Sequence, residues 1–288
     1  MEEYTAQLEA QLQPVEVHDS MAEAGRKILL ADFIRMLKHE HGARLGDDAE
    51  EVHDMRVATR RMRSAVRLFE GYYKPKWIYY YNRRLRKIAR ALGAVRDLDV
   101  LIEGVEQYAA SLTLPKRGSH RKMSDEEKNE REALQATLTA QHEALTEALA
   151  LVRAQREGAR EELLELFNSK GYNRFVGEFG TFLTTAGQGA AKDAGYPVGL
   201  MVPGIIYERL TAVRIHDHDV EVHTVESLHA LRVEFKRLRY TAAFFVDING
   251  KEADDFIDEL KKVQDHLGRL NDAVVAQAIN GGTGRRSG

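Results

Sequence analysis

The residues of this sequence with the clearest chemical potential form a row of basic side chains. His53, Arg56, Arg60, Arg63 and Arg67, the first basic row, recur every three or four residues, which places them on one face of a helix. At a rise of ~1.5 Å per residue, such a row is about 21 Å long. Arginine holds phosphate oxygens with its planar fork, and lysine acts as a compact charge. The row therefore predicts binding of an extended, multiply charged anion, with no metal or other cofactor required.

The positive charge of the chain is concentrated around this row. The 288 residues include 42 Lys and Arg against 45 Asp and Glu, a net charge of −3. Residues 53–90 hold 12 basic and 2 acidic residues, so this segment carries +10 and the rest of the chain −13. A polyanionic partner is one reason for such crowding; a solvated face neutralised by acidic helices elsewhere is the other. The acidic balance overall argues against a generally basic nucleic-acid binder.

The row is repeated later in the chain. At an offset of 176 residues its counterparts are His229, Arg232, Lys236 and Arg239, which we call the second basic row. At an offset of 175, Arg86 and Gly93 match Lys261 and Gly268. A fixed offset indicates duplicated structural units. We therefore predict two pseudo-symmetric helical-bundle repeats.

Helices must position both rows. Apolar residues recur at spacings of three and four throughout, with no sustained alternation of period two, which predicts an all-α fold. In both rows the basic residues follow the apolar ones by one position, or about 100° around a helix. The rows therefore border the core, where they can line a groove between packed helices. Arg83, Arg86 and Arg90 form a further basic face on the next predicted helix.

The predicted helices cover almost the whole chain. They span about residues 21–41, 49–72, 76–92, 97–112, 125–158, 161–168, 172–186, 205–216, 225–248, 251–267 and 272–279. Gly93 is predicted to end the third of these helices. Ser124 is predicted to cap the long fifth helix, with Glu127 placed as in a capping box. The Gly- and Arg-containing tail, residues 281–288, is predicted to be disordered.

Composition excludes several classes of site. With no Cys, the chain has no disulfide framework, thiolate metal site or Cys nucleophile. No apolar segment approaches the ~20 residues of a membrane span and no signal core is evident, so we expect a soluble, cytoplasmic protein. His216, His218 and His223, with two intervening Asp residues, do not share a helix face, and we predict no metal site there.

Two sets of segments resemble the signatures of the CHAD (conserved histidine α-helical) domain family. The first set is His53–Val57, Arg60–Arg63 and Leu92–Asp99, and the second is His229–Val233, Lys236–Tyr240 and Leu267–Asp272. The resemblance covers roughly residues 21–278. It implies two helical-bundle repeats around a basic central channel that binds inorganic polyphosphate. It also implies recruitment to polyphosphate granules and no enzymatic activity of the domain itself.

The resemblance also implies which residues bind the polymer. Carried over residue by residue, the channel is lined by His53, Arg56, Arg60, Arg63, Arg86, His229, Arg232, Lys236, Arg239 and Lys261; Arg67, Arg83 and Arg90 are added on helical spacing. We expect residues 1–20 to be an N-terminal extension and residues 21–280 the domain, with repeats of about 21–115 and 125–280. The second repeat, which includes a long helical hairpin, should bind more weakly, because Ala243 replaces Arg67 and Asp265 replaces Arg90.

Several residues keep two interpretations. His53 and His229 either contact phosphate or pack at the edge of the core. Asp97 and Asp272 are expected to cap a helix or pair with an Arg rather than perform acid–base chemistry. Arg61 and Arg237 lie off the rows and are expected to form ion pairs. Residues 77–81, a Trp and three Tyr around Ile78, stack on nucleobases or, more commonly, pack between helices.

Three functions are compatible with the sequence. The first is non-catalytic binding of polyphosphate, and the second is nucleic-acid binding through the same basic rows. The third is an enzyme acting on phosphoanhydrides, which would need a carboxylate metal cluster or a nucleophile–base pair near the rows. The sequence shows neither device, so we favour the first function.

Overall fold

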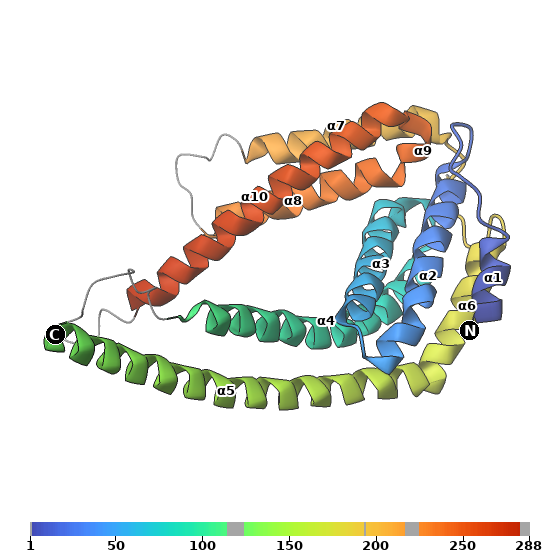
Figure 1. Ribbon diagram of the computed structural model, residues 1–288. Coiled ribbons are helices and arrows are strands. Elements are labelled where there is room, and N and C mark those ends of the chain that lie inside the picture. The colour runs from blue at the N-terminus through green and yellow to red at the C-terminus, as the bar shows by residue number, and fades with distance from the viewer. Residues whose placement is uncertain (1, 114–123, 193, 217–224, 283–288) are drawn as a thin grey trace. The chain divides into compact units, whose positions relative to one another are not determined.

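The computed structural model describes residues 2–113, 124–192, 194–216 and 225–282, the last twelve and Val225 by their backbone alone. In these residues every regular element is a helix, which confirms the all-α prediction (Figure 1). The α-helices are α1 (Glu2–Glu9), α2 (Met21–Leu45), α3 (Ala49–Leu68), α4 (Pro75–Ser111), α5 (Asp125–Asn168), α6 (Lys170–Thr184), α7 (Val198–Ile215), α8 (Val225–Phe244), α9 (Val246–Asn249) and α10 (Lys251–Gly282). A short 3-10 helix covers Glu70–Tyr72. No described helix is long and apolar enough to cross a membrane.

The start of α5 follows the capping pattern predicted from the sequence. The Ser124 hydroxyl accepts a hydrogen bond from the Glu127 backbone N–H at 3.2 Å. The Glu127 carboxylate accepts one from the Ser124 N–H at 2.8 Å. Two N–H groups that a helix start leaves unpaired are thereby satisfied, and the capping-box prediction is confirmed.

Several predicted boundaries are wrong. Helix α4 continues past Gly93 and α10 past Gly268, so neither glycine ends a helix. The predicted helices over residues 125–158 and 161–168 are one helix, α5, and α7 begins at Val198 rather than at residue 205. Helix α1, in the expected N-terminal extension, was not predicted. The tail residues 283–288 lie outside the described residues, and the two glycines before them belong to α10.

Each of the two signature glycines instead lies beside an arginine. A Cβ atom added to Gly93 would lie 3.9 Å from the Arg56 guanidinium, and one added to Gly268 would lie 4.0 Å from that of Arg232. Both are ordinary contact distances. The same local arrangement thus occurs at equivalent positions of both sequence repeats.

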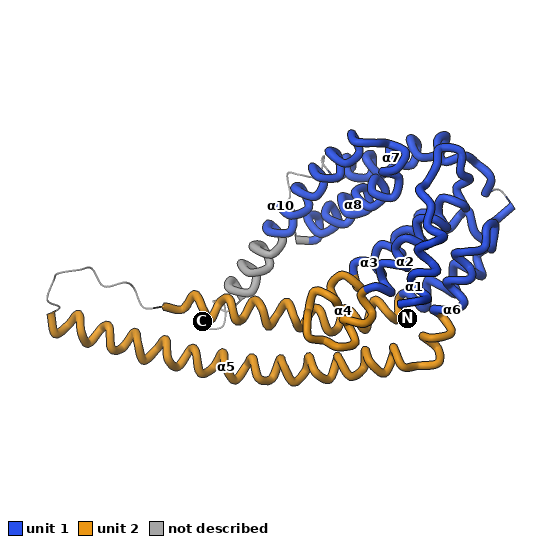
Figure 2. The backbone as a smooth tube through the Cα atoms, turned by 45° about the vertical axis from the view of Figure 1, so that its right-hand side comes forward, with its two compact units in different colours: residues 1–38, 57–85, 176–288 blue, residues 39–56, 86–175 orange. Residues whose placement is uncertain are grey.

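The described chain divides into two compact units, shown in Figure 2. Unit 1 contains residues 1–38, 57–85 and 176–288, and unit 2 contains residues 39–56 and 86–175. Helices α2, α3, α4 and α6 each contribute to both units. The units therefore divide the chain differently from the sequence repeats, whose pseudo-symmetry stays a prediction.

The interior of unit 1 is rich in aromatic rings. The rings of Phe69 and Phe245, which are equivalent at the offset of 176, meet edge to face at 6.0 Å between centroids. Both side chains are fully buried. Leu238 of α8 packs with Val213 of α7 and Leu260 of α10. Burying such large side chains fixes α8 against its neighbours.

Unit 2 is held together at the junction of α2 with α5 and α6. The Tyr172 hydroxyl donates to the buried Glu40 carboxylate at 2.7 Å. Arg44 bonds to the same carboxylate at 2.8 Å and lies 4.9 Å from the centre of the Phe167 ring. Arg160 of α5 donates to the last carbonyl groups of α2, including that of Arg44 at 2.9 Å. Arg160 thereby pairs carbonyl groups at the C-terminal end of α2, which have no partner within the helix.

Candidate anion-binding site

The two basic rows meet in unit 1 at the ring of Tyr240. The Cζ atom of Arg60, on α3, lies 5.9 Å from the ring centroid, and that of Arg239, on α8, lies 5.0 Å from it. The tyrosine is buried, with 3% of its surface exposed. A guanidinium within ~6 Å of an aromatic ring is attracted to its electron-rich face. We call Arg60, Arg239 and Tyr240 the arginine–tyrosine cluster.

The cluster has unused hydrogen-bond donors. The Nε atoms of Arg60 and Arg239 and the hydroxyl of Tyr240 are buried and have no hydrogen-bond partner among the described residues. No acidic side chain in that part of the chain forms an ion pair with either arginine. Burying a charged group without a counter-charge is costly. An anion bound between α3 and α8 would offset this cost, since arginine binds phosphate oxygens with two parallel bonds.

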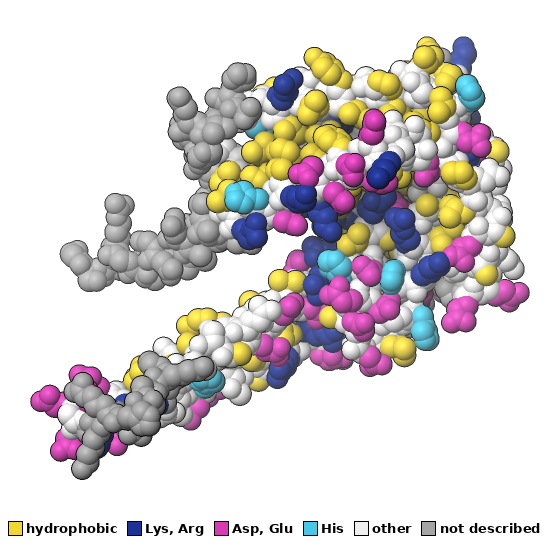
Figure 3. All heavy atoms as spheres, turned by 45° about the horizontal axis from the view of Figure 1, so that its top comes forward, with side chains coloured by type: hydrophobic (Ala, Val, Ile, Leu, Met, Phe, Trp, Pro, Cys, Tyr) yellow, Lys and Arg dark blue, Asp and Glu magenta, His cyan; other side chains and the backbone are white. Residues whose placement is uncertain are grey.

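The other predicted residues of unit 1 lie on α3, α4, α8 and α10. Arg63, Arg232 and Lys236 are half-buried, whereas Arg67, Arg83, His229 and Lys261 are exposed. Within the described residues, Arg67, Arg83, Arg232 and Lys261 have no acidic partner. Lys and Arg side chains gather in groups on the face shown in Figure 3 rather than being spread evenly. The charges of Arg67, Arg83, Arg232 and Lys261 are therefore not neutralised by described acidic residues and are available to a ligand from outside.

Unit 2 holds the remaining four predicted residues. Arg56 forms an ion pair with the exposed Asp97 at 2.9 Å, which confirms that Asp97 pairs with an arginine. His53 is half-buried, and both of its interpretations remain open. Arg86 and Arg90 are exposed, without an acidic partner in the described chain. A single channel lined by all the predicted residues stays a prediction.

Arginines off the basic rows form ion pairs, as predicted. Arg61 bonds to the buried Asp32 at 2.8 Å, and Arg237 pairs with Glu234 one turn earlier. Asp99, two residues after Asp97, is also paired, with Arg156 at 2.8 Å. These carboxylates serve as counter-charges for arginines.

The aromatic segment at the start of α4 packs inside unit 1. Trp77 and Tyr81 contact the Phe182 ring at centroid distances of 5.4 and 4.9 Å, whereas Tyr79 is 72% exposed. The packing interpretation therefore holds for Trp77 and Tyr81. The histidine cluster at residues 216–223 lies almost wholly outside the described residues. Within them, no group of three or more His, Asp or Glu side chains could hold a metal ion.

Sequence reasoning gave Tyr240 no role, although it lies at the centre of the cluster. The signal was available: Tyr240 follows Lys236 by four residues, which puts both on one helix face. The ion pair of Arg61 was predicted but its partner was not, because its contacts come from Asp32 on α2 and from α8. Such contacts between distant segments leave no mark in local spacing.

Comparison with known proteins identifies the family. The sequence pattern of the CHAD domain matches residues 27–280. The chain belongs to the CHAD domain family. It is also 26% identical over 268 residues to an uncharacterized protein found in each of two strains of Mycobacterium tuberculosis. The match covers 91% of this chain but 44% of the relative, so the chain spans less than half the length of these relatives.

Solved structures share the CHAD fold. The crystal structure of the CHAD domain from the plant Ricinus communis is 23% identical, with a TM-score of 0.66 over 96% of this chain and 83% of that one. PptA from Streptomyces chartreusis is 12% identical, with a TM-score of 0.54 over 90% and 86% of the two chains. At these identities the likeness concerns the fold alone.

Proposed function

We propose that this CHAD domain binds inorganic polyphosphate without chemical conversion, through the basic rows of α3 and α8. The observation that carries the proposal is the arginine–tyrosine cluster, in which two arginines from different rows meet with buried, unused donors. A chain of phosphates offers regularly spaced anionic oxygens, which suit successive guanidiniums along a helix. The family, known for polyphosphate binding, supports this choice of anion.

The same binding would bring the protein to polyphosphate granules. The chain as a whole is acidic, at −3, so it has no general attraction to polyanions. Attraction limited to the basic rows favours a ligand that is thin enough to follow them closely. A nucleic acid, whose phosphates carry bulky sugars and bases, is the competing ligand that the experiment must exclude.

The test is a titration of the protein with long-chain polyphosphate across a range of salt concentrations, with single-stranded DNA and heparin as competitors. The informative variant is Arg60→Gln/Arg239→Gln. Its matched control is Lys128→Gln/Arg153→Gln, which removes the same charge from two ion-paired side chains of α5. If each arginine contributes a charged hydrogen bond of ~1.5 kcal/mol, affinity falls by about 100-fold. The control should change affinity by less than about threefold.

The salt dependence gives a second readout. Losing two phosphate contacts should lower the slope of log affinity against log salt by about 1.4, taking ~0.7 per contact for a single-stranded polyanion. Equal losses in the variant and the control would contradict the assigned site. Displacement of polyphosphate by DNA at equal phosphate concentration would favour nucleic-acid binding instead, and release of orthophosphate from the polymer would contradict the absence of catalysis.

A further inference from the structure

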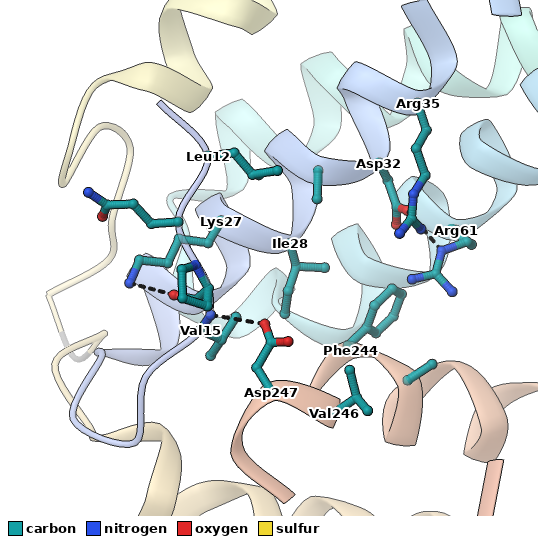
Figure 4. Close-up of a pocket in the computed structure, with 14 residues that line it drawn as sticks. Leu12, Val15, Lys27, Ile28, Asp32, Arg35, Arg61, Phe244, Val246 and Asp247 are labelled. Atoms are coloured by element: carbon teal, nitrogen blue, oxygen red, sulfur yellow. Dashed lines mark hydrogen bonds and ion pairs between the residues drawn. The ribbon is translucent and has the colours of Figure 1, made fainter. Parts of the chain in front are cut away.

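A buried ion pair between Asp32 and Arg61 lies next to the arginine–tyrosine cluster. Asp32 of α2 is buried, with 1% of its side chain exposed, and its Oδ1 atom accepts from Arg61 Nε at 2.8 Å and from Arg35 Nη1 at 3.1 Å. Figure 4 shows the three side chains pointing toward one another, with the Phe244 ring next to them. They line one end of a pocket of about 370 Å³ within unit 1.

Of the two arginines on Asp32, only Arg61 reaches the rings of α8. Its Cζ atom lies 5.2 Å from the centroid of Phe244 and 5.9 Å from that of Tyr240. The side chain of Arg61 is 19% exposed, compared with 57% for Arg35. Contacts therefore run from Asp32 through Arg61 to the same ring that Arg60 and Arg239 share.

Stability alone is a poor explanation for this arrangement. Burying an ion pair costs nearly as much solvation as the attraction returns, and apolar residues in its place are often at least as stabilising. Burial raises the pKa of Asp32 above its usual value, although Arg61 and Arg35 both oppose the rise. The pair does fix the orientation of the Arg61 side chain, because a carboxylate bonded at Nε holds the plane of the guanidinium.

We propose that Arg61, anchored by Asp32, is a positioning residue for anion binding. It holds the Tyr240 ring in place, and the ring in turn sets the separation of Arg60 and Arg239. In this proposal Arg61 acts through the Tyr240 ring, which it contacts, rather than through a bond to the anion. This inference rests on the proposed function and adds to it: affinity depends on how the two arginines are held as well as on their charges.

The chain offers a matched control for this idea. Arg61→Gln and Arg35→Gln each remove one positive charge and one partner of Asp32, but only Arg61 contacts Tyr240. We expect Arg61→Gln to weaken polyphosphate binding about tenfold. A loss of this size is comparable to the energy of about one cation–π contact at a buried site. Arg35→Gln should weaken it less than about twofold. Similar losses in both variants would mean that only overall charge matters and would overturn the proposal.

A double-mutant cycle separates positioning from direct contact. Tyr240→Phe keeps the ring and removes only the hydroxyl, so Arg61→Gln should still cause its full loss of affinity in that background. Tyr240→Leu removes the ring, after which Arg61→Gln should cause little further loss of affinity. Additive losses would show that Arg61 acts independently of Tyr240, and that result also overturns the proposal.

Folding is controlled by measuring helicity and the urea midpoint of each variant. If Arg61→Gln fails to fold, Asp32→Asn replaces it in the cycle, since it removes the anchor at nearly constant volume and leaves Arg61 present. Its loss of affinity should also vanish in the Tyr240→Leu background. Failure of the unchanged protein to bind polyphosphate would refute the proposed function, whereas normal binding by a folded Arg61→Gln protein would refute this inference alone.

Discussion

The ion pair between Arg56 and Asp97 competes with any anion that Arg56 binds. The two side chains are 2.9 Å apart, and the side chain of Asp97 is 70% exposed. Replacing Asp97 by Asn removes the competing carboxylate at nearly constant shape. We expect Asp97→Asn to bind polyphosphate more tightly than the unchanged protein, in contrast to most changes near a binding site.

The size of the gain follows from two contributions. Breaking an exposed ion pair costs about 0.5 kcal/mol, within the measured range for surface pairs. If a bound phosphate lies about 7 Å from Asp97, removing the negative charge relieves a repulsion of ~0.5 kcal/mol in a medium as polar as water, less at high salt. Together they amount to about 1 kcal/mol, or an affinity gain of about fivefold.

Asp54→Asn provides the control, because it removes the same charge from a carboxylate of the same unit. The basic partner of Asp54 is His39, at 3.9 Å, which belongs to neither basic row. Only the repulsion is then relieved, so affinity should rise about twofold. Both variants would be titrated with polyphosphate at low and near-physiological salt. Equal gains would show that Arg56 is not released for binding, and a loss in Asp97→Asn would show that the pair holds Arg56 in its binding position.

Three further predictions concern the scaffold. Tyr172→Phe removes the hydroxyl that donates to the buried Glu40 at 2.7 Å, and should lower the free energy of unfolding in urea by about 1–3 kcal/mol. Gly46→Ala should also destabilise the folded protein, because Gly46 has φ +77° and its new Cβ would lie 2.4 Å from Arg160. In contrast, Gly104→Ala, at an open position within α4, should stabilise the folded protein by about 0.5–1 kcal/mol. Asp32, whose pKa burial raises above 3.8, contributes stability that is present below pH 3.8 and lost as pH rises through its folded-state pKa. The stability of the unchanged protein relative to Asp32→Asn should therefore decrease as pH rises through this interval, and a constant difference in urea titrations would contradict the raised pKa.

How far the sequence predicts this structure depends on the range of the interactions. The start of α5 was predictable because Ser124 and Glu127 bond to each other over three residues. The helix end assigned at Gly93 was wrong because Gly93 does not take the positive φ of a C-terminal glycine and continues within α4, as Gly268 does within α10. Intrinsic propensities are weak and tertiary contacts override them.

The candidate site was likewise predictable only where it depends on local spacing. Helical spacing alone placed Arg60 and Arg239 beside the core, and that is where the structure has them. Spacing could not indicate that both would approach one ring, because this depends on how α3 packs with α8. Nor could it indicate that Asp32, on a third helix, would be the counter-charge of Arg61.

The distribution of counter-charges supports the function proposed for the basic rows. If an acidic chain needed its arginines only for solubility, carboxylates would be expected beside each of them. Instead, Arg61 and Arg237, which lie off the rows, are paired with acids, whereas Arg60 and Arg239 on the rows have no acidic partner in the described chain. Arg56, also on a row, is paired with the exposed Asp97, so the lack of counter-charges concerns the arginines of the cluster and does not extend to every row arginine. In the proposed function a bound anion would supply the missing counter-charge, and affinity should therefore depend more strongly on Arg60 and Arg239 than on the net charge of the chain.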